Sequence, residues 1–96
     1  MILVTGEILA KPAARALLLE AGLAHTHRSR TEPGCLAHHL HVDVEDPNRL
    51  VFVERWTDRA ALDEHFGRTE SIEFVTQLRA WAEGRPRMDI FTVPDA

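Results

Sequence analysis

The apolar and polar positions along the chain predict four strands. Residues 2–9 are mostly apolar and contain β-branched side chains, which favour an extended backbone. In residues 35–44 and 49–57 alternate side chains fall on opposite faces, with the period of two that is typical of strands. Residues 87–93 predict the last strand, because a glycine and a proline just before them stop the preceding helix.

The two middle strands carry polar groups on faces that should build a core. In the first strand, one face is predicted to carry Leu36, His38, Leu40, Val42 and Val44. Its opposite face is predicted to carry Cys35, Ala37, His39, His41 and Asp43. In the second strand, one face carries Leu50, Phe52, Glu54 and Trp56. The turn Asp46-Pro47-Asn48 predicts that the two strands pair as a hairpin.

Three helices are predicted between the strands. Apolar residues recur at helical spacing in residues 13–30, and the predicted stripe is Ala14, Leu17, Leu18, Ala21 and Ala24. Asp58 is a favourable N-cap for a short helix over residues 59–66. Thr69 or Ser71 is predicted to cap a third helix, whose apolar stripe is Ile72, Val75, Leu78, Trp81 and Ala82.

The predicted order of elements is β-α-β-β-α-α-β, in a single domain that spans residues 1–96. This order predicts an α+β fold, a ferredoxin-like sandwich with one antiparallel sheet and helices on one side. The opposite face of the sheet must then be covered. A second copy of the sheet is the simplest cover, so we expect a homodimer, which also buries more surface for a small core.

Length and composition narrow the class of protein. A chain of 96 residues is too short for two independent cores, and its net charge of -4 argues against a nucleic-acid-binding surface. No apolar run is long enough to span a bilayer, and the N-terminal residues lack the pattern of a signal peptide. The single Cys35 has no internal partner and is predicted to be a small buried hydrophobe. We expect a cytoplasmic protein without nucleic-acid or membrane partners.

Four short motifs follow one another between residues 32 and 65. They are Glu32-Pro33-Gly34-Cys35-Leu36, Asp46-Pro47-Asn48, Glu54-Arg55-Trp56 and Ala61-Leu62-x-x-His65. In this order and spacing they resemble the antibiotic biosynthesis monooxygenase domain family, and in particular its small quinol-monooxygenase-like members. The resemblance covers nearly the whole chain, because the order of strands and helices also fits.

The resemblance implies a dimeric α/β barrel, in which two ferredoxin-like sheets pack face to face and each protomer has a ligand cavity between sheet and helices. It also implies a cofactor-independent monooxygenase that oxidises a small quinol or polycyclic phenol with O2. The deprotonated substrate donates an electron to oxygen, so the protein has to bind the ring, stabilise its anion and exclude water. The implied partners are a small aromatic molecule and O2, and no cofactor is expected.

Other functions occur among proteins of the same family appearance. An isomerase or other small-ligand enzyme of the same fold and a non-catalytic ligand-binding dimer are the open alternatives. Haem degradation is disfavoured. The haem-degrading branch is similar in fold but has an Asn on the first strand, a Trp in the short helix and a ligating His in the next helix. This chain has Glu7, His65 and Val75 near those places.

His65 and Glu54 are the predicted catalytic residues. His65 ends the short helix, and an imidazole that titrates near neutrality can remove a phenolic proton or hold the resulting anion. The alternative is that His65 caps the helix or packs against Glu54. A carboxylate in mid-strand is costly unless paired, so Glu54 is expected to orient His65 or His39, or to pair with an arginine across the dimer.

The predicted substrate-binding residues are His38, His39, Phe52, Trp56, Phe66, Phe74 and Trp81. Aromatic residues of this kind are most often plain core. One of the two adjacent histidines is expected to face the cavity and the other the dimer interface, and the sequence leaves open which one.

No metal site is predicted. His39 and His41 share a strand face, and His65 is a conceivable third ligand, but no carboxylate stands at a fixed ligand spacing. His25 and His27 lie two residues apart on a helix, cannot converge on one ligand, and are predicted to be solvated.

Overall fold

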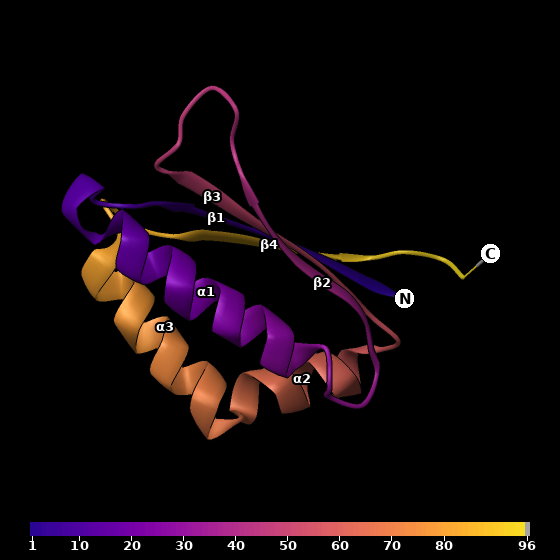
Figure 1. The fold of residues 1–96 in the computed structure, drawn as a ribbon. Coiled ribbons are helices and arrows are strands. Elements are labelled where there is room, and N and C mark those ends of the chain that lie inside the picture. Colours follow the sequence, from indigo (N-terminus) through magenta and orange to yellow (C-terminus); the bar gives the residue numbers. More distant parts are fainter. Residues whose placement is uncertain (96) are drawn as a thin grey trace.

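The computed structural model describes residues 1–95 and contains the predicted elements in the predicted order (Figure 1). The strands are β1 (Ile2–Leu9), β2 (Cys35–Val42), β3 (Arg49–Trp56) and β4 (Arg87–Thr92). The helices are α1 (Arg15–Ser29), α2 (Arg59–Gly67) and α3 (Thr69–Trp81), and a 3₁₀ turn, η1 (Pro12–Ala14), precedes α1. The predicted α+β class is confirmed.

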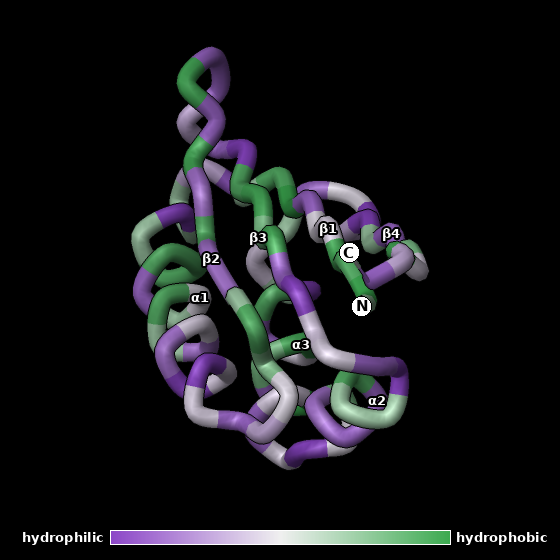
Figure 2. Tube along the Cα trace, turned by 90° about the vertical axis from the view of Figure 1, so that its right-hand side faces the viewer, coloured by the Kyte–Doolittle hydropathy of each residue, from purple (hydrophilic) through white to green (hydrophobic). Residues whose placement is uncertain are grey.

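The four strands form one sheet of order β2-β3-β1-β4, in which all neighbours are antiparallel. Helices α1, α2 and α3 lie together against one face of this sheet (Figure 1). The predicted ferredoxin-like arrangement is therefore confirmed. The turn between β2 and β3 projects beyond the helices (Figure 2), and Val44 in this turn is 99% exposed.

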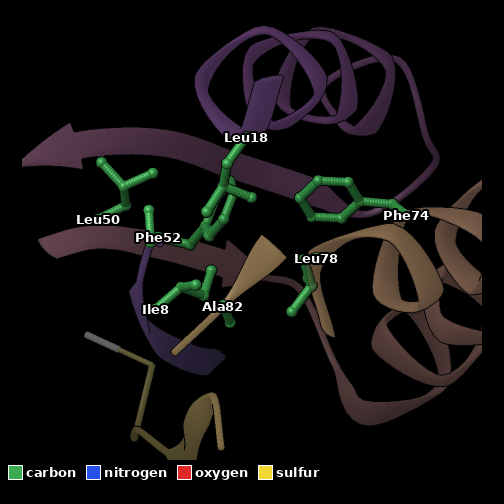
Figure 3. Close-up of a cluster of buried hydrophobic side chains, with 8 residues drawn as sticks. Ile8, Leu18, Leu50, Phe52, Phe74, Leu78 and Ala82 are labelled. Carbon is green, nitrogen blue, oxygen red and sulfur yellow. The ribbon is translucent and has the colours of Figure 1, made fainter. Parts of the chain in front are cut away.

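The inward face of β3 follows the period of two that the sequence predicts, and β1 shows the same period. On β1 the buried residues are Ile2, Val4, Gly6 and Ile8. On β3 they are Leu50, Phe52, Glu54 and Trp56. A larger apolar cluster joins β1 and β3 to α1 and α3 through Leu18, Phe74 and Leu78 (Figure 3). A smaller cluster joins the other end of these strands to Leu62 of α2.

A bulge at Leu36 breaks the alternation predicted for β2. Cys35 pairs with Trp56 of β3, but Ala37 pairs with the adjacent residue, Arg55, so one residue of β2 is extra. Cys35 therefore lies on the inward face of the sheet, whereas the prediction placed it on the other face together with Ala37.

The starts of α2 and α3 differ in how they are capped. The carboxylate of Asp58 accepts a hydrogen bond of 2.9 Å from the backbone N–H of Ala61, which confirms the predicted N-cap of α2. Helix α3 begins without a side-chain cap, so neither Thr69 nor Ser71 has the capping role predicted for it.

The inward faces of α1 and α3 also differ from the predicted apolar stripes. Leu17 and Ile72, predicted to face the sheet, are exposed. The buried residues of α1 are Leu18, Gly22, His25, Thr26 and Ser29. Those of α3 are Ser71, Phe74 and Leu78. Polar side chains therefore occupy inward positions of both helices, and apolar spacing alone does not reveal them.

The outward face of the sheet has no cover among residues 1–95 (Figure 1). Its centre mixes apolar and polar side chains. Val53 of β3 pairs with Thr5 of β1 and with His39 of β2, which puts it in the middle of this face. Val51 and Val53 are thus apolar positions on an uncovered face whose other central residues are polar.

We expect Gly22→Leu to destabilise the fold by about 1–3 kcal/mol, the usual cost of overpacking a tight contact. A Cβ atom at Gly22 would already lie 3.1 Å from a Leu40 methyl carbon and 3.3 Å from the Phe52 ring. Gly67→Ala is the matched control, because nothing lies within 4 Å of its added Cβ atom and alanine favours a helix. Urea unfolding measures both variants. Equal stability of Gly22→Leu and the wild type would contradict this close packing.

Candidate functional site

A cavity of about 860 Å³ opens between the inward face of the sheet, α3 and residues 84–88, which lead into β4. This volume suits a small organic ligand, since such sites span roughly 300–1,000 Å³. Gly6 contributes a wall without a side chain, and Ile8 and Leu78 contribute apolar surface. The cavity thus lies beside the larger apolar cluster.

Five of the predicted site residues line this cavity. They are Phe52, Glu54, His65, Phe66 and Phe74. They come from β3, α2 and α3, three elements that are separated in the sequence and meet under the sheet. The structure therefore brings both predicted catalytic residues to one cavity with three of the predicted aromatic residues.

The other predicted residues do not line the cavity. His38 and Trp56 are fully buried beside Glu54, behind the cavity wall, and Trp81 packs against the larger apolar cluster. His39 lies on the outward face, where its ring is exposed and Nη2 of Arg30 donates to its Nδ1 at 3.1 Å. Of the two adjacent histidines, His38 is thus the one on the inward face.

Glu54 is buried at the centre of a polar cluster. The indole N–H of Trp56 donates to Oε1 of Glu54 at 3.0 Å. The Nε2 atoms of His38 and His65 lie 3.4 Å and 4.0 Å from the same oxygen. Burial raises the pKa of Glu54 from 4.5 to about 7, and the charge of Glu32 adds to this, while the bond from Trp56 opposes it. A carboxyl with this pKa can exchange a proton near neutral pH.

His65 is paired with Glu32. Its Nδ1 donates to Oε1 of Glu32 at 2.8 Å, and the guanidinium of Arg68 lies 3.2 Å from the same oxygen. Burial lowers the pKa of His65, and the hydrogen bond and charge of Glu32 partly oppose this effect. The pairing with Glu32 was not predicted, because this residue was assigned to a turn.

His25 is the site residue that the sequence analysis missed. It was predicted to be solvated, but it is only 6% exposed and lines the cavity. Its ring stacks on Phe74 with 4.3 Å between ring centroids, and Nη2 of Arg28 donates to its Nδ1 at 3.0 Å. The available signal is the spacing of Leu18, Gly22, His25 and Ser29, which places these residues on one face of α1. His27, on the other side of the helix, is exposed as predicted.

Three histidine rings meet at the inner end of the cavity. Ring nitrogens of His25, His38 and His65 lie within 4.8 Å of one another. This trio differs from the strand histidines that were weighed as metal ligands from the sequence. Because the guanidinium of Arg28 can only donate, Nδ1 of His25 accepts, and the proton of the neutral ring lies on Nε2. The trio therefore offers a hydrogen-bond donor together with lone pairs, which suits a polar ligand better than a metal ion.

The buried position of these rings keeps two of them neutral. Burial, followed by the influence of the neighbouring histidines, lowers the pKa values of His25 and His38 from 6.5 to about 3. Nδ1 of His38 shares a hydrogen bond of 3.1 Å with the hydroxyl of Thr26, whereas its Nε2 has no hydrogen-bond partner. This nitrogen lies 3.4 Å from Oε1 of Glu54, so it faces the buried carboxyl and not the cavity.

A small α+β sandwich with an ionisable, largely apolar cavity under its sheet has the kind of concave site in which proteins bind small ligands. Residues 1–77 match the sequence model of the antibiotic biosynthesis monooxygenase family, and the chain belongs to this family. The resemblance predicted from the four motifs is thereby confirmed. Within residues 1–95, no helix combines the length and apolar character needed to cross a membrane.

Similar proteins include an uncharacterized protein of Synechocystis sp., which is 36% identical over 74 residues. That match covers 77% of this chain and 50% of the relative, so the chain spans about half the length of this curated relative. A crystal structure described as an antibiotic biosynthesis monooxygenase is 32% identical, with a TM-score of 0.91 and coverage of 99% of this chain and 100% of that chain.

Two further solved structures have the same fold. Rv0793 of Mycobacterium tuberculosis is 25% identical, with a TM-score of 0.92 and coverage of 99% of this chain and 96% of that chain. PA3566 of Pseudomonas aeruginosa is 26% identical, with a TM-score of 0.87 and coverage of 98% and 94%. These similarities extend over the whole sandwich, including the sheet and all helices that surround the cavity.

We expect Glu54→Gln to gain stability relative to the wild type as the pH rises. Because the pKa of Glu54 is raised from 4.5 to about 7 on folding, its contribution to stability is full below pH 4.5 and is lost as the pH rises through 7. The amide of Glu54→Gln does not ionise, so this variant does not lose stability in this way. The difference in unfolding free energy between the variant and the wild type should therefore change by about 3 kcal/mol between pH 4.5 and about pH 8.

Urea unfolding of both proteins across this pH range measures the effect. His25 and His38 act in the opposite direction, since their pKa values are lowered and stability is lost as the pH falls from 6.5 toward 3. Both proteins retain these histidines, so their contributions largely cancel in the comparison. A difference that stays constant with pH would contradict the raised pKa of Glu54.

Proposed function

We propose that this protein is a cofactor-independent monooxygenase that oxidises a small quinol or polycyclic phenol with O2. The observation that carries the proposal is a buried carboxyl, Glu54, whose pKa is raised to about 7 and which lines an aromatic cavity together with His65. Membership of the antibiotic biosynthesis monooxygenase family supports the same reaction class.

In the proposed reaction Glu54 takes the proton of a substrate hydroxyl. A base whose pKa lies near the working pH is present in its ionised form and still takes up a proton readily. Nε2 of His65 lies 4.0 Å from Oε1 of this carboxyl, so the neutral ring can relay the proton from the substrate to Glu54. Phe52 and Phe74, with ring centroids 5.8 Å apart, would hold the aromatic ring and exclude water.

This reaction needs no reductant other than the quinol itself. A quinol anion transfers an electron to O2, and the two radicals combine to form a bond between a ring carbon and oxygen. The O–O bond then breaks, so that one oxygen atom stays on the ring and the other leaves as water. A quinol and O2 thereby give a hydroxyquinone and water, and the quinol supplies all four electrons that O2 accepts.

The same pair of groups also favours a second candidate, an isomerase. Glu54 and His65 lie on one side of the cavity, and two proton carriers can remove a proton from one atom and return it to another. An isomerase consumes no oxygen, so oxygen uptake distinguishes the two candidates.

We expect the wild type to consume oxygen with at least one member of a panel of quinols, anthrones and catechols. Glu54→Gln should lower kcat/KM by about 100- to 10,000-fold, the usual contribution of a positioned general base. His65→Ala should also lower it, while His27→Gln, an exposed change on α1, should not. A ligand screen that finds binding while no compound consumes oxygen would refute the monooxygenase, and full activity of Glu54→Gln would refute the assigned base.

We also propose that the outward face of the sheet is covered by a second copy of this chain, which gives the dimeric barrel that the family resemblance implies. The valines Val51 and Val53 on this uncovered face support this assembly, because protein interfaces combine apolar and polar side chains in this way. Val53→Arg places a charge in the middle of the face and should convert a dimer into a monomer. Sedimentation velocity at micromolar concentration measures the change, with Val44→Arg in the projecting turn as the control. A wild type that sediments as a monomer would overturn this assembly.

A further inference from the structure

Three histidine rings lie together at the inner end of the cavity, and the two that line it have hydrogen-bond directions fixed by their neighbours. Ring nitrogens of His25, His38 and His65 lie within 4.8 Å of one another. The Nδ1 atom of each ring already has a partner. It is the guanidinium of Arg28 for His25 at 3.0 Å, the hydroxyl of Thr26 for His38 at 3.1 Å, and the carboxylate of Glu32 for His65 at 2.8 Å. Nε2 of His38 lies behind the cavity wall, 3.4 Å from Oε1 of Glu54, so the Nε2 atoms of His25 and His65 are the ones left to meet a ligand.

Arg28 and Glu32 give His25 and His65 opposite tautomers. A guanidinium only donates, so Nδ1 of His25 accepts from Arg28 and the proton of the neutral ring lies on Nε2. The carboxylate of Glu32 only accepts, so Nδ1 of His65 carries the proton and its Nε2 has a free lone pair. Both rings line the cavity. The cavity thus has a fixed donor and a fixed acceptor on neighbouring rings.

We propose that this inner end is a binding subsite for a phenolic hydroxyl, in which His25 donates from Nε2 to the oxygen and His65 accepts at Nε2. A hydroxyl oxygen accepts one hydrogen bond and donates another, so it satisfies both rings at once. The choice of a phenol as ligand rests on the proposed function, whereas the pairing of donor and acceptor rests on the geometry alone.

Arg28 makes the subsite suitable for the anion of the phenol as well. Among residues 1–95, no carboxylate lies within 4.0 Å of the Arg28 guanidinium, so no neighbour neutralises its charge. This charge acts on the ligand through the ring of His25, whose Nε2–H becomes a stronger donor. A preorganised neutral donor of this kind stabilises an oxyanion once its proton has left through Nε2 of His65, which lies 4.0 Å from Oε1 of Glu54.

The aromatic surroundings favour a ring attached to this hydroxyl. His25 stacks on Phe74 with an angle of 13° between the rings, and Phe52 lies at 6.2 Å from His25 in an edge-on orientation. Flat apolar walls meet the polar inner end directly. A phenol presents the same sequence of surfaces, an apolar ring that ends in one hydroxyl oxygen.

The first test uses 4-nitrophenol, because its phenolate absorbs at longer wavelength than the phenol. The measurement is made under argon, so that the compound is not oxidised. At a pH where the free compound is mostly protonated, the wild type should bind it with a rise in phenolate absorbance. His25→Phe should bind it about 10- to 100-fold more weakly, as expected for a lost hydrogen bond to a charged group. His25→Gln should retain most of the affinity, because its amide N–H reaches the position of Nε2.

The matched control is His27→Phe, which makes the same change two residues along α1 at an exposed position and should leave binding unchanged. Binding of the phenolate by His25→Phe with wild-type affinity would overturn the subsite. Normal nitrophenolate binding together with no oxygen uptake from the panel of quinols would instead refute the monooxygenase and leave the subsite intact.

The second test needs no variant of His25. Nitrogen-15 correlation spectra of the wild type should show the proton of His25 on Nε2 and that of His65 on Nδ1, and a proton on Nδ1 of His25 would overturn the proposal. Arg28→Met should shift His25 toward the other tautomer and reduce phenolate absorbance, and Arg28→Lys should restore both.

A visible Co²⁺ spectrum at stoichiometric metal, lost in His38→Phe, would also overturn the proposed subsite, because the rings would then act as metal ligands.

Discussion

The rest of the structure depends on a carboxyl group that is buried in the middle of the inward sheet face. Such a group has to find hydrogen-bond donors or hold a proton, because a buried carboxylate loses most of its hydration. Trp56, two residues along the same strand, donates one hydrogen bond to Glu54, and the rings of His38 and His65 occupy the space around it. Each ring needs a further partner in turn. One buried acid on β3 therefore accounts for polar residues on β2, α1, α2 and the turn before β2.

This polar cluster lies between two apolar clusters and does not interrupt them. Along β3, Leu50 and Phe52 belong to the larger cluster and Trp56 to the smaller one, with Glu54 between them. Burial of apolar surface on both sides stabilises the sandwich, so the middle layer is free to be polar. The apolar packing on both sides also holds the polar rings in fixed orientations. A binding site requires this when its hydrogen-bonding groups are preorganised for the ligand.

The strands and their order along the chain could be predicted because β1 is rich in apolar and β-branched residues and β3 keeps the period of two, including the position of Glu54. The bulge at Leu36 could not, since an extra residue changes the faces of a strand without changing its composition. His25 was missed because the apolar stripe used for α1 assumed an apolar partner surface. The inward face of α1 instead contacts the polar cluster of the sheet. Which surface a helix contacts is decided by the tertiary structure and cannot be read from the helix alone. Glu32 was missed for a related reason: its Pro-Gly neighbours define a turn, but its side chain points inward to His65.

The walls of the cavity come from two parts of the chain. The match to the family extends over residues 1–77, which include Glu54, His65 and the histidines around them. The outer wall includes residues after this match, among them Arg79 and the segment 84–88. The buried ionisable groups and the outer wall are thus carried by separate stretches of sequence. A substitution in the short segment 84–88 therefore changes the outer wall of the cavity without removing any group of the buried network beneath the sheet.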